Sequence, residues 1–417
     1  MQVASRFGRL SLRRQLFAPL GDQPHCMPGN ALLPAHQGMI ITRGLQERAC
    51  LWPQDLPFAL VARLLGWQAQ TEAVLSDTSI RTLVRTHGQI IRQAEQEEVR
   101  ALLAQPDLSA HTPQLVSPTQ PRRRAGWPAE LSAAVDKALQ DGLAAPPEGV
   151  SRADWERVLH VRRQEAALPV EALRQLGPQV QPEQTLVTMD EVLTRAVGKR
   201  HFWEIRTARV STPAGTRYLS GTGPALLRQL LVLLLLCAVR WPALLVVADG
   251  ARWTRTWFGE LCAVLPGSAL ILDWWHLCKR CRELASMACR GRKAKVALLR
   301  PIYRHLWQGE VAAAVALLEA YRPEARNLDR LEEWITYLRE RTPYIPNYRE
   351  RRRTCQYIGS GAVEKVNDLL VARRQKGEGM RWQESTSDAL AALRTLMLNG
   401  GWDGYWQHHQ VLPLVAT

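Results

Sequence analysis

The chain has 417 residues, 46% of them hydrophobic, and this length exceeds one ordinary core, so two or three domains are expected. A formal net charge of +15 favours a polyanionic partner, because basic side chains that meet phosphates release condensed counterions. The longest apolar run, 230–239, spans ten residues. A helix that crosses a bilayer needs about twenty, so no membrane partner is expected.

The N-terminus shows neither the apolar core nor the cleavage site of a secretory signal. The eight cysteines form no small-domain framework, and we expect reduced thiols in a cytoplasm, here a bacterial one. Cys278, Cys281 and Cys289 with His276 have part of the spacing of a zinc site, but no second cysteine pair faces them. Packing on one face of a helix is the favoured interpretation.

Residues 1–55 form an N-terminal arm whose structure the pattern leaves open, and residues 56–104 are predicted to be helical. Pro57 can occupy the first turn of a helix, after which apolar residues recur at helical spacing. Ser76 and Asp77 offer N-cap oxygens to a second helix. The pattern therefore predicts two consecutive helices.

The second of these helices has a basic, hydroxyl-rich face that includes Arg81 and Arg85. Two such helices resemble a helix-turn-helix, whose second helix would bind DNA. An ordinary helical hairpin fits the same pattern. The connection of about eight residues is also longer than the tight turn of the strict motif.

Residues 105–128 contain five prolines and three consecutive arginines, a composition that favours an extended, solvated linker. A helical connector is expected over 129–184. The segment 185–276 then predicts three strands, a helix, a strand, a helix and a strand, which make a mixed sheet with crossover units. Beyond it we expect a helical insertion over 277–358 and further helices over 359–417.

Acidic residues follow or interrupt the apolar strands of this segment at Asp190, Asp249 and Asp273. A further acid, Glu364, opens a helical pattern directly after a glycine-rich turn. Converging carboxylates can bind two Mg²⁺ ions, which activate an attacking oxygen and stabilise a leaving oxygen in phosphoryl transfer. Any one strand-end aspartate is more often a simple cap for the next loop, so only the set as a whole indicates chemistry.

These residues resemble the catalytic domain of bacterial insertion-sequence transposases of the DDE type, in the mutator-like group. The resemblance covers about half the chain, from Leu186 to Trp402, and is thin before residue 185. The motifs that carry it are the Asp190 strand, Ala248 to Trp253, Leu272 to His276, Gly359 to Glu364, Gly379 to Trp382, and Asn399 to Trp402.

The resemblance implies an α/β fold with an RNase H-like mixed sheet and a large all-helical insertion, preceded by a helical DNA-binding region. In that family the first acid lies on the first strand, the second follows the fourth strand, and the glutamate starts a helix after the insertion. These catalytic and metal-binding roles fall on Asp190, Asp249 and Glu364. Asp273 and His276 match a pattern that would orient the metal ligands or the DNA.

One departure from the family pattern is Glu191, where a small residue is expected after the first acid. Consecutive side chains of a strand point to opposite faces, so only one of the two acids can enter the site. Asp190 is favoured because it follows the apolar run directly.

The expected activity is cleavage at transposon ends and strand transfer into target DNA, with two Mg²⁺ ions for which Mn²⁺ would substitute. The expected partners are transposon-end and target DNA and a second copy of the chain, as a homodimer or larger assembly. An RNase H-like nuclease without strand transfer, and a domesticated DNA-binding protein with an inactive core, are the alternatives. The residues predicted to contact DNA are Arg81, Arg85, Arg252, Trp253, Arg373, Arg374, Lys376, Arg381 and Trp382.

Overall fold

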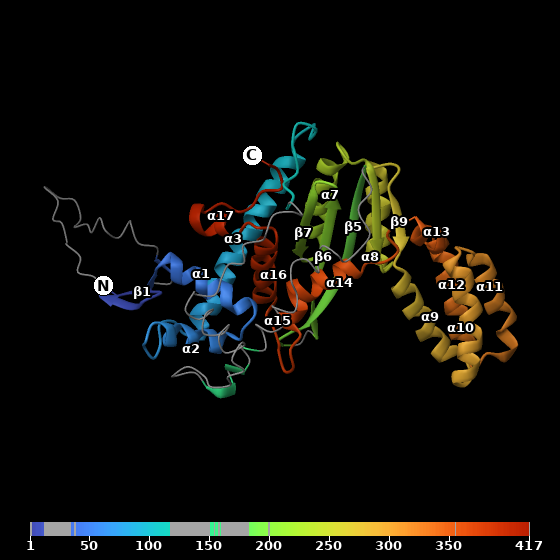
Figure 1. The fold of residues 1–417 in the computed structure, drawn as a ribbon, viewed down its shortest axis with the longest axis horizontal. Coiled ribbons are helices and arrows are strands. Elements are labelled where there is room, and N and C mark those ends of the chain that lie inside the picture. The colour runs from blue at the N-terminus through green and yellow to red at the C-terminus, as the bar shows by residue number, and fades with distance from the viewer. Residues whose placement is uncertain are drawn as a thin grey trace.

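The computed structural model describes residues 2–11, 35–36, 39–116, 183–198, 201–354 and 356–416, together with a few residues between 151 and 159. A five-stranded mixed sheet forms the centre of the molecule, in the order β7-β6-β5-β8-β9 (Figure 1). β8 and β9 are parallel to β5, and β6 and β7 continue the sheet in antiparallel fashion. The strands are β5 (Gln184–Arg195), β6 (Phe202–Thr212), β7 (Gly215–Gly221), β8 (Ala243–Ala248) and β9 (Ala269–Leu272). The predicted mixed sheet with crossover helices is confirmed.

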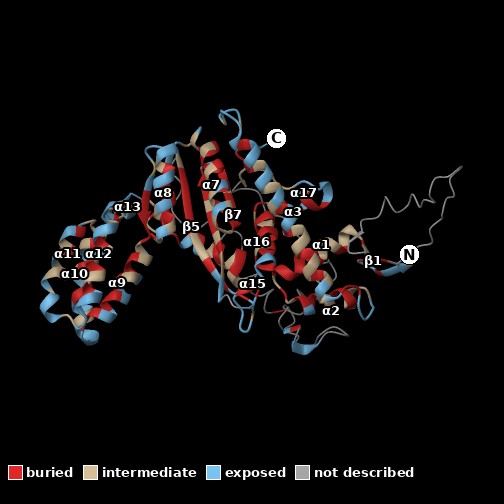
Figure 2. Cartoon of the chain, turned by 180° about the vertical axis from the view of Figure 1, so that it is seen from behind, coloured by how far each residue is buried: buried red, intermediate tan, exposed pale blue. Residues whose placement is uncertain are grey.

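Helices cover both faces of this sheet, and the alternation along β5 assigns its side chains to them. Val187 and Met189 pack in a core with α7 (Gly223–Ala238) and α8 (Arg252–Val264). Val192 packs on the other face, in a core with α14 (Gly361–Asn367) and α16 (Glu384–Leu398). In Figure 2 β5 and much of α16 are coloured as buried.

The helices after β9 form a separate bundle at one end of the molecule (Figure 1). They share a core around Trp334, Ile302 and Leu318. The first of them starts at Trp274, three residues before the expected boundary at 277, because Asp273 caps it. The bundle consists of α9 (Trp274–Ala288), α10 (Gly291–Trp307), α11 (Val311–Ala320), α12 (Leu328–Arg341) and α13 (Tyr348–Arg353).

At the other end, α1 (Arg43–Leu51), α2 (Phe58–Gln68) and α3 (Asp77–Leu103) pack together. Ser76 caps α3 by accepting from the backbone N–H of Ser79 at 3.1 Å, as the sequence predicts. α3 is 27 residues long and lies along α16. A Cβ added to Gly88 of α3 would lie 2.4 Å from the Cβ of Ala389, so glycine permits this close approach.

Two groups of short elements complete the chain around this end. Residues 2–41 contribute a small sheet of strands β1 (Gln2–Ser5), β2 (Gly8–Ser11), β3 (Ala35–His36) and β4 (Met39–Ile41). After α14 come a π-helical turn, η5 (Asp368–Ala372), α15 (Arg373–Gln375) and, beyond α16, α17 (Trp402–His408). The sequence had predicted no structure for the first of these regions.

The predicted linker 105–128 is described only as far as residue 116, where it contains a turn, with His111 N donating to Leu108 O at 3.0 Å, and pairs with other segments of the chain. The backbone of Val116 exchanges hydrogen bonds with Thr216 of β7, and Gln114 N donates to Leu414 O at 2.7 Å. This half of the predicted linker is therefore held against the sheet edge by backbone pairing. The arginine triplet at 122–124, and the connector predicted over 129–184 apart from its last residues and a few near 155, lie outside the described residues. Among the helices that the structure describes, none is long and apolar enough to cross a membrane.

Candidate active site

Asp190 lies on β5 and faces α14. Its Oδ2 accepts a hydrogen bond from Asn367 Nδ2 at 2.6 Å, and its Oδ1 accepts from the backbone N–H of Glu191 at 2.8 Å. Asn367 also accepts a hydrogen bond from Thr207 on β6, which fixes the orientation of its amide. Burial raises the pKa of Asp190, the Glu191 N–H lowers it, and the charges of Asp249 and Glu364 raise it further. The pKa of Asp190 is therefore raised by the charges of both other predicted acids.

Glu191 points to the opposite face of β5, as strand geometry predicts. Its Oε2 accepts from Trp253 Nε1 of α8 at 2.9 Å, and the guanidinium of Arg206 lies 4.1 Å from the Trp253 ring. Burial raises the pKa of Glu191, and the nearby Glu204 adds to the rise. Glu191 is thus engaged on the α8 side, while Asp190 faces α14.

Asp249 directly follows β8 in a tight turn. Its Oδ1 accepts from the backbone N–H of Ala251 at 2.9 Å, just before α8 begins. Gly250 has φ +74°, and a Cβ there would lie 2.7 Å from a methyl carbon of Leu272. The turn that orients Asp249 therefore requires glycine.

Asp273 follows β9 and is completely buried. Its Oδ1 accepts from the backbone N–H groups of Trp275 at 2.7 Å and His276 at 2.9 Å, which caps α9. Its Oδ2 accepts from the backbone N–H of Ser360 and, at 2.6 Å, from its hydroxyl. Burial alone would raise the pKa of Asp273, but hydrogen bonds from His276 and Ser360 outweigh it and lower the pKa to about 2. Asp273 therefore ties the start of α9 to the segment that precedes α14.

Glu364 lies in the first turn of α14, with 54% of its side chain exposed. Its Oε1 is 3.9 Å from His276 Nε2, and His276 Nδ1 is 3.3 Å from Asp273 Oδ1. The interaction with Asp273 raises the pKa of His276 despite its partial burial, and the charges of Asp249 and Asp190 add to the rise. His276 therefore lies among all four acids that sequence analysis singled out.

The structure thus brings Asp190, Asp249, Glu364 and His276 within electrostatic reach of one another. Within the described ranges, no group of three or more His, Cys, Asp and Glu side chains is arranged to hold a metal ion. The cysteines considered for zinc are instead buried in the packing of α9, as favoured above, and burial raises the pKa of Cys278 and Cys281 to about 12.

Two of the residues predicted to contact DNA are corrected by the structure. Trp382 is buried, and its Nε1 donates to Gln375 O at 2.9 Å. Arg374 is also buried; its Nε donates to Pro53 O at 2.5 Å, and its guanidinium lies 4.7 Å from the Trp382 ring. Burial lowers the pKa of Arg374 to about 10, although the Asp55 charge opposes the shift. Both side chains join the C-terminal segment to the N-terminal helices and leave no surface for DNA.

The other predicted DNA contacts remain at least partly accessible. Arg81 forms an ion pair with Asp77 at 3.2 Å, and Arg85 donates to Gln383 Oε1 at 3.5 Å. Trp253 is half-buried through its contacts with Glu191 and Arg206. Exposed or partly exposed side chains also occur at Arg252, Arg373, Lys376 and Arg381.

Sequence analysis missed three residues of this region: Asn367, Ser360 and Trp275. Asn367 follows Glu364 by three positions, so helical periodicity could have placed both on one side of α14. Ser360 stood inside the glycine turn that had been noted. Trp275 is 66% exposed between Asp273 and His276, and only tertiary structure distinguishes it from the buried tryptophans.

No family model matches the chain, and no curated protein matches it. Among solved structures, the chain is similar to the strand transfer complex of the Drosophila P element transposase, with 10% sequence identity over 70% of this chain and 83% of that chain. The TM-score is 0.20. At that value the similarity supports no inference about the fold, and any functional assignment depends on the carboxylates themselves.

Proposed function

We propose that this chain is a DNA transposase of the DDE type, with an RNase H-like core in which Asp190, Asp249 and Glu364 are the catalytic carboxylates. The observation that supports this proposal is that three acids from distant elements of the chain lie within electrostatic reach of one another. One acid lies on the first strand of the five-stranded sheet, one follows the fourth strand, and one starts a helix beyond a helical bundle. Elements so far apart in sequence bring these carboxylates within electrostatic reach, at a cost in mutual repulsion that a structural role does not require.

The chemistry of the donor set suits Mg²⁺, because carboxylate oxygens are the ligands that this ion prefers, although the side chains that the structure describes are not arranged as a metal site. Asp190, Asp249 and Glu364 would hold two ions, and Mn²⁺ would substitute for them. When bound, the metal supplies a polarised phosphate and an activated attacking oxygen. Burial is the largest cause of the raised pKa of Asp190, and the charges of Asp249 and Glu364 add to it; a bound cation would offset these charges.

The surrounding residues position these carboxylates. The Asn367 amide orients Asp190, the Gly250 turn orients Asp249, and the Asp273–Ser360 hydrogen bonds set the start of the helix that carries Glu364. The reaction itself breaks one phosphodiester bond by attack of water and forms another by attack of a DNA 3′-hydroxyl. Each attack expels one DNA oxygen as the leaving group, so no covalent enzyme intermediate is needed.

The accessible cations near α8 and α14–α16 would bind the DNA backbone, and Trp275 would stack on an unpaired base at the cut. Phosphate contacts supply much of the affinity, and base–aromatic stacking is worth about 1–3 kcal/mol per base. Holding two transposon ends requires more than one active site, so a homodimer or larger assembly on DNA is part of this proposal.

The test compares Asp249→Asn and Glu364→Gln with wild type on duplexes that carry the DNA flanking the gene. Both variants should lose cleavage by at least about a hundredfold in Mg²⁺ or Mn²⁺, because each removes a charged oxygen from the reacting centre. DNA binding in Ca²⁺ should stay within about twofold, since phosphate contacts come from basic side chains. Asp368→Asn, a partly exposed carboxylate that pairs with Lys365 in the helical segment after α14, is the matched control and should cleave normally.

Two outcomes would contradict the proposal. Loss of DNA binding together with cleavage would make these acids structural, and normal cleavage by both variants would place the chemistry elsewhere. A joined product between the cleaved end and a target plasmid separates a transposase from a nuclease, which would release ends without joining them.

A further inference from the structure

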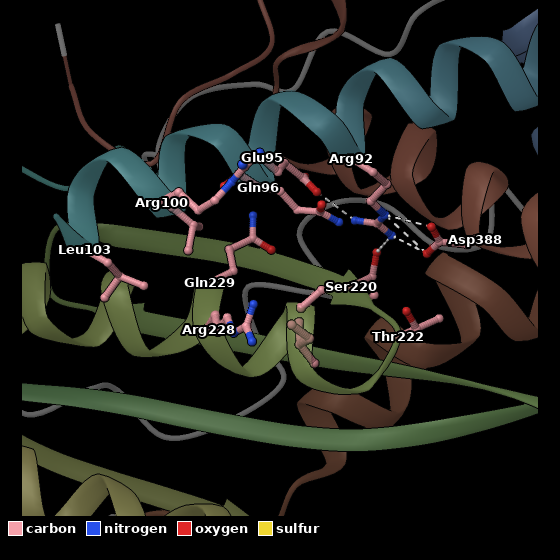
Figure 3. Close-up of a pocket in the computed structure, with 14 residues that line it drawn as sticks. Arg92, Glu95, Gln96, Arg100, Leu103, Ser220, Thr222, Arg228, Gln229 and Asp388 are labelled. Atoms are coloured by element: carbon pink, nitrogen blue, oxygen red, sulfur yellow. Dashed lines mark hydrogen bonds and ion pairs between the residues drawn. The ribbon is translucent and has the colours of Figure 1, made fainter.

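A cavity of about 370 Å³ lies between α3 and the first turns of α7, at the edge of the sheet beside β7 (Figure 3). Ser220 of β7 lines it and is in register with Thr207, which is in register with Asp190. Two strand spacings, about 10 Å, therefore separate the backbone at this cavity from the backbone at Asp190. The size falls within the range of small-molecule sites.

Arg92 lines this cavity, and hydrogen bonds hold its side chain in one position. Its guanidinium donates to both oxygens of Asp388 at 3.0–3.2 Å, to Glu95 at 2.9 Å and to Ser220 at 3.1 Å (Figure 3). Burial lowers the pKa of Arg92, but its two carboxylate partners outweigh burial and raise the pKa above its usual range. Both acids of the lining are therefore paired with one largely buried arginine.

Two further arginines of the lining, Arg100 and Arg228, are exposed and form no ion pair among the described residues. Arg100 donates only to the backbone oxygen of Gln96, at 3.3 Å. Three arginines thus face two carboxylates, which leaves the lining positive.

A second and independent feature of the cavity, the side chain of Gln229, also indicates a ligand. Gln229 is 5% exposed, and Figure 3 shows its amide projecting from α7 toward α3. Within the part of the chain that the structure describes, this amide has no hydrogen-bond partner. The amide atoms keep contact with solvent in the cavity, so a ligand with a complementary donor and acceptor would take the place of water there. Apolar walls flank it at Val99, Leu103, Ala225 and Leu226.

We infer that this cavity binds a nucleotide, with its phosphate at Arg100 and Arg228 and the edge of its base at Gln229. A base presents a flat apolar face together with adjacent donors and acceptors, which matches the apolar walls and the amide. The source is either a free nucleotide or the last nucleotide of a DNA strand. Nucleotide binding at this cavity is a separate property from the proposed DNA cleavage, and it can be tested under conditions where no cleavage occurs.

The test is calorimetric titration of the full-length chain with deoxynucleoside monophosphates in EDTA, where no cleavage occurs. Saturable binding is expected, with inorganic phosphate at least tenfold weaker because it offers nothing to Gln229. Gln229→Leu and Arg228→Gln should each weaken binding about tenfold, the loss of one hydrogen bond or ion pair in a desolvated site. Arg240→Gln, an exposed arginine just beyond the same helix, should leave it unchanged.

Competition distinguishes the two sources. If a single-stranded oligonucleotide displaces the bound mononucleotide, the natural ligand is a DNA end. If the mononucleotide stays bound, the natural ligand is a free nucleotide. The inference is overturned by absent binding, by phosphate binding as tightly as the nucleotide, or by variants with wild-type affinity. Arg228→Gln changes an exposed residue and so remains informative if Gln229→Leu fails to fold. A chain that binds nucleotide but never cuts DNA would overturn the proposed function alone.

Discussion

Asp249 and Asp273 each follow a parallel strand directly, yet their surroundings give them different properties. Asp273 is enclosed by donors from two segments, whereas Asp249 receives one backbone hydrogen bond and remains partly accessible. Four donors satisfy the Asp273 oxygens internally, which leaves little capacity to bind substrate or metal. Asp249 keeps its second oxygen available, and that difference favours Asp249 as the reacting group and Asp273 as a positioning group.

The enclosure of Asp273 predicts a specific pH dependence of stability. Its folded pKa of about 2 lies below the unfolded value of about 3.9, so the unfolded chain binds more protons between these pH values. The stabilisation is present above pH 4 and is lost as the pH falls through about 2, an effect of about 2–3 kcal/mol.

Urea unfolding at pH 2 to 5 measures this effect. The wild-type free energy of unfolding should fall more steeply with decreasing pH than that of Asp273→Asn, which lacks the titrating group. Parallel pH profiles for the two proteins would show that the carboxylate is not stabilised as the hydrogen bonds indicate.

At the scale of elements, α3 serves two purposes along its 27 residues. Its middle is buried against α16 through the Gly88–Ala389 contact, and Arg92 is locked to Asp388. Its first turns retain partly exposed cations at Arg81 and Arg85. These first turns are the part of α3 that sequence analysis proposes as a recognition helix, and their role in DNA binding stays a prediction.

Replacing Arg81 and Arg85 with Ala tests that role. If the helix reads base edges, affinity for transposon ends should fall more than affinity for random duplex, by about 1–3 kcal/mol per base contact. If these arginines touch only phosphates, both affinities should fall equally, and the log–log salt slope should flatten by about 0.9 per lost contact. Binding measured for both duplexes over several salt concentrations decides between them. Unchanged affinity for both would reduce the start of α3 to a packing element.

For the whole molecule, the sequence predicts elements better than it predicts which distant segments meet. The Ser76 cap, the buried strand before Asp249 and the helix that begins just before Glu364 are local patterns, and each occurs as predicted. The burial of Arg374 and Trp382 depends instead on N-terminal helices more than 300 residues away, at Pro53 and Phe58. No local pattern encodes that packing, so a basic, aromatic stretch was interpreted as a DNA surface.

The same packing predicts that the two ends of the chain unfold together. One apolar core contains residues of α1–α3 as well as α16 and α17, and Arg394 donates to both oxygens of Asp55 at 2.6 and 3.1 Å across it. The two side chains of this pair are only 9% and 13% exposed. Removing one partner of a buried ion pair leaves an uncompensated charge, which typically costs about 3–5 kcal/mol.

Arg394→Leu should therefore lower the free energy of unfolding by about that amount, and Asp55→Leu combined with it should recover part of the loss because no lone charge remains. Urea unfolding with tryptophan fluorescence gives the energies. Limited proteolysis should show 39–103 and 384–408 becoming cleavable at the same urea concentration. If the N-terminal helices become cleavable first, while α16 and α17 stay protected, the shared core does not couple the two ends, and the N-terminal region is an independently folding unit.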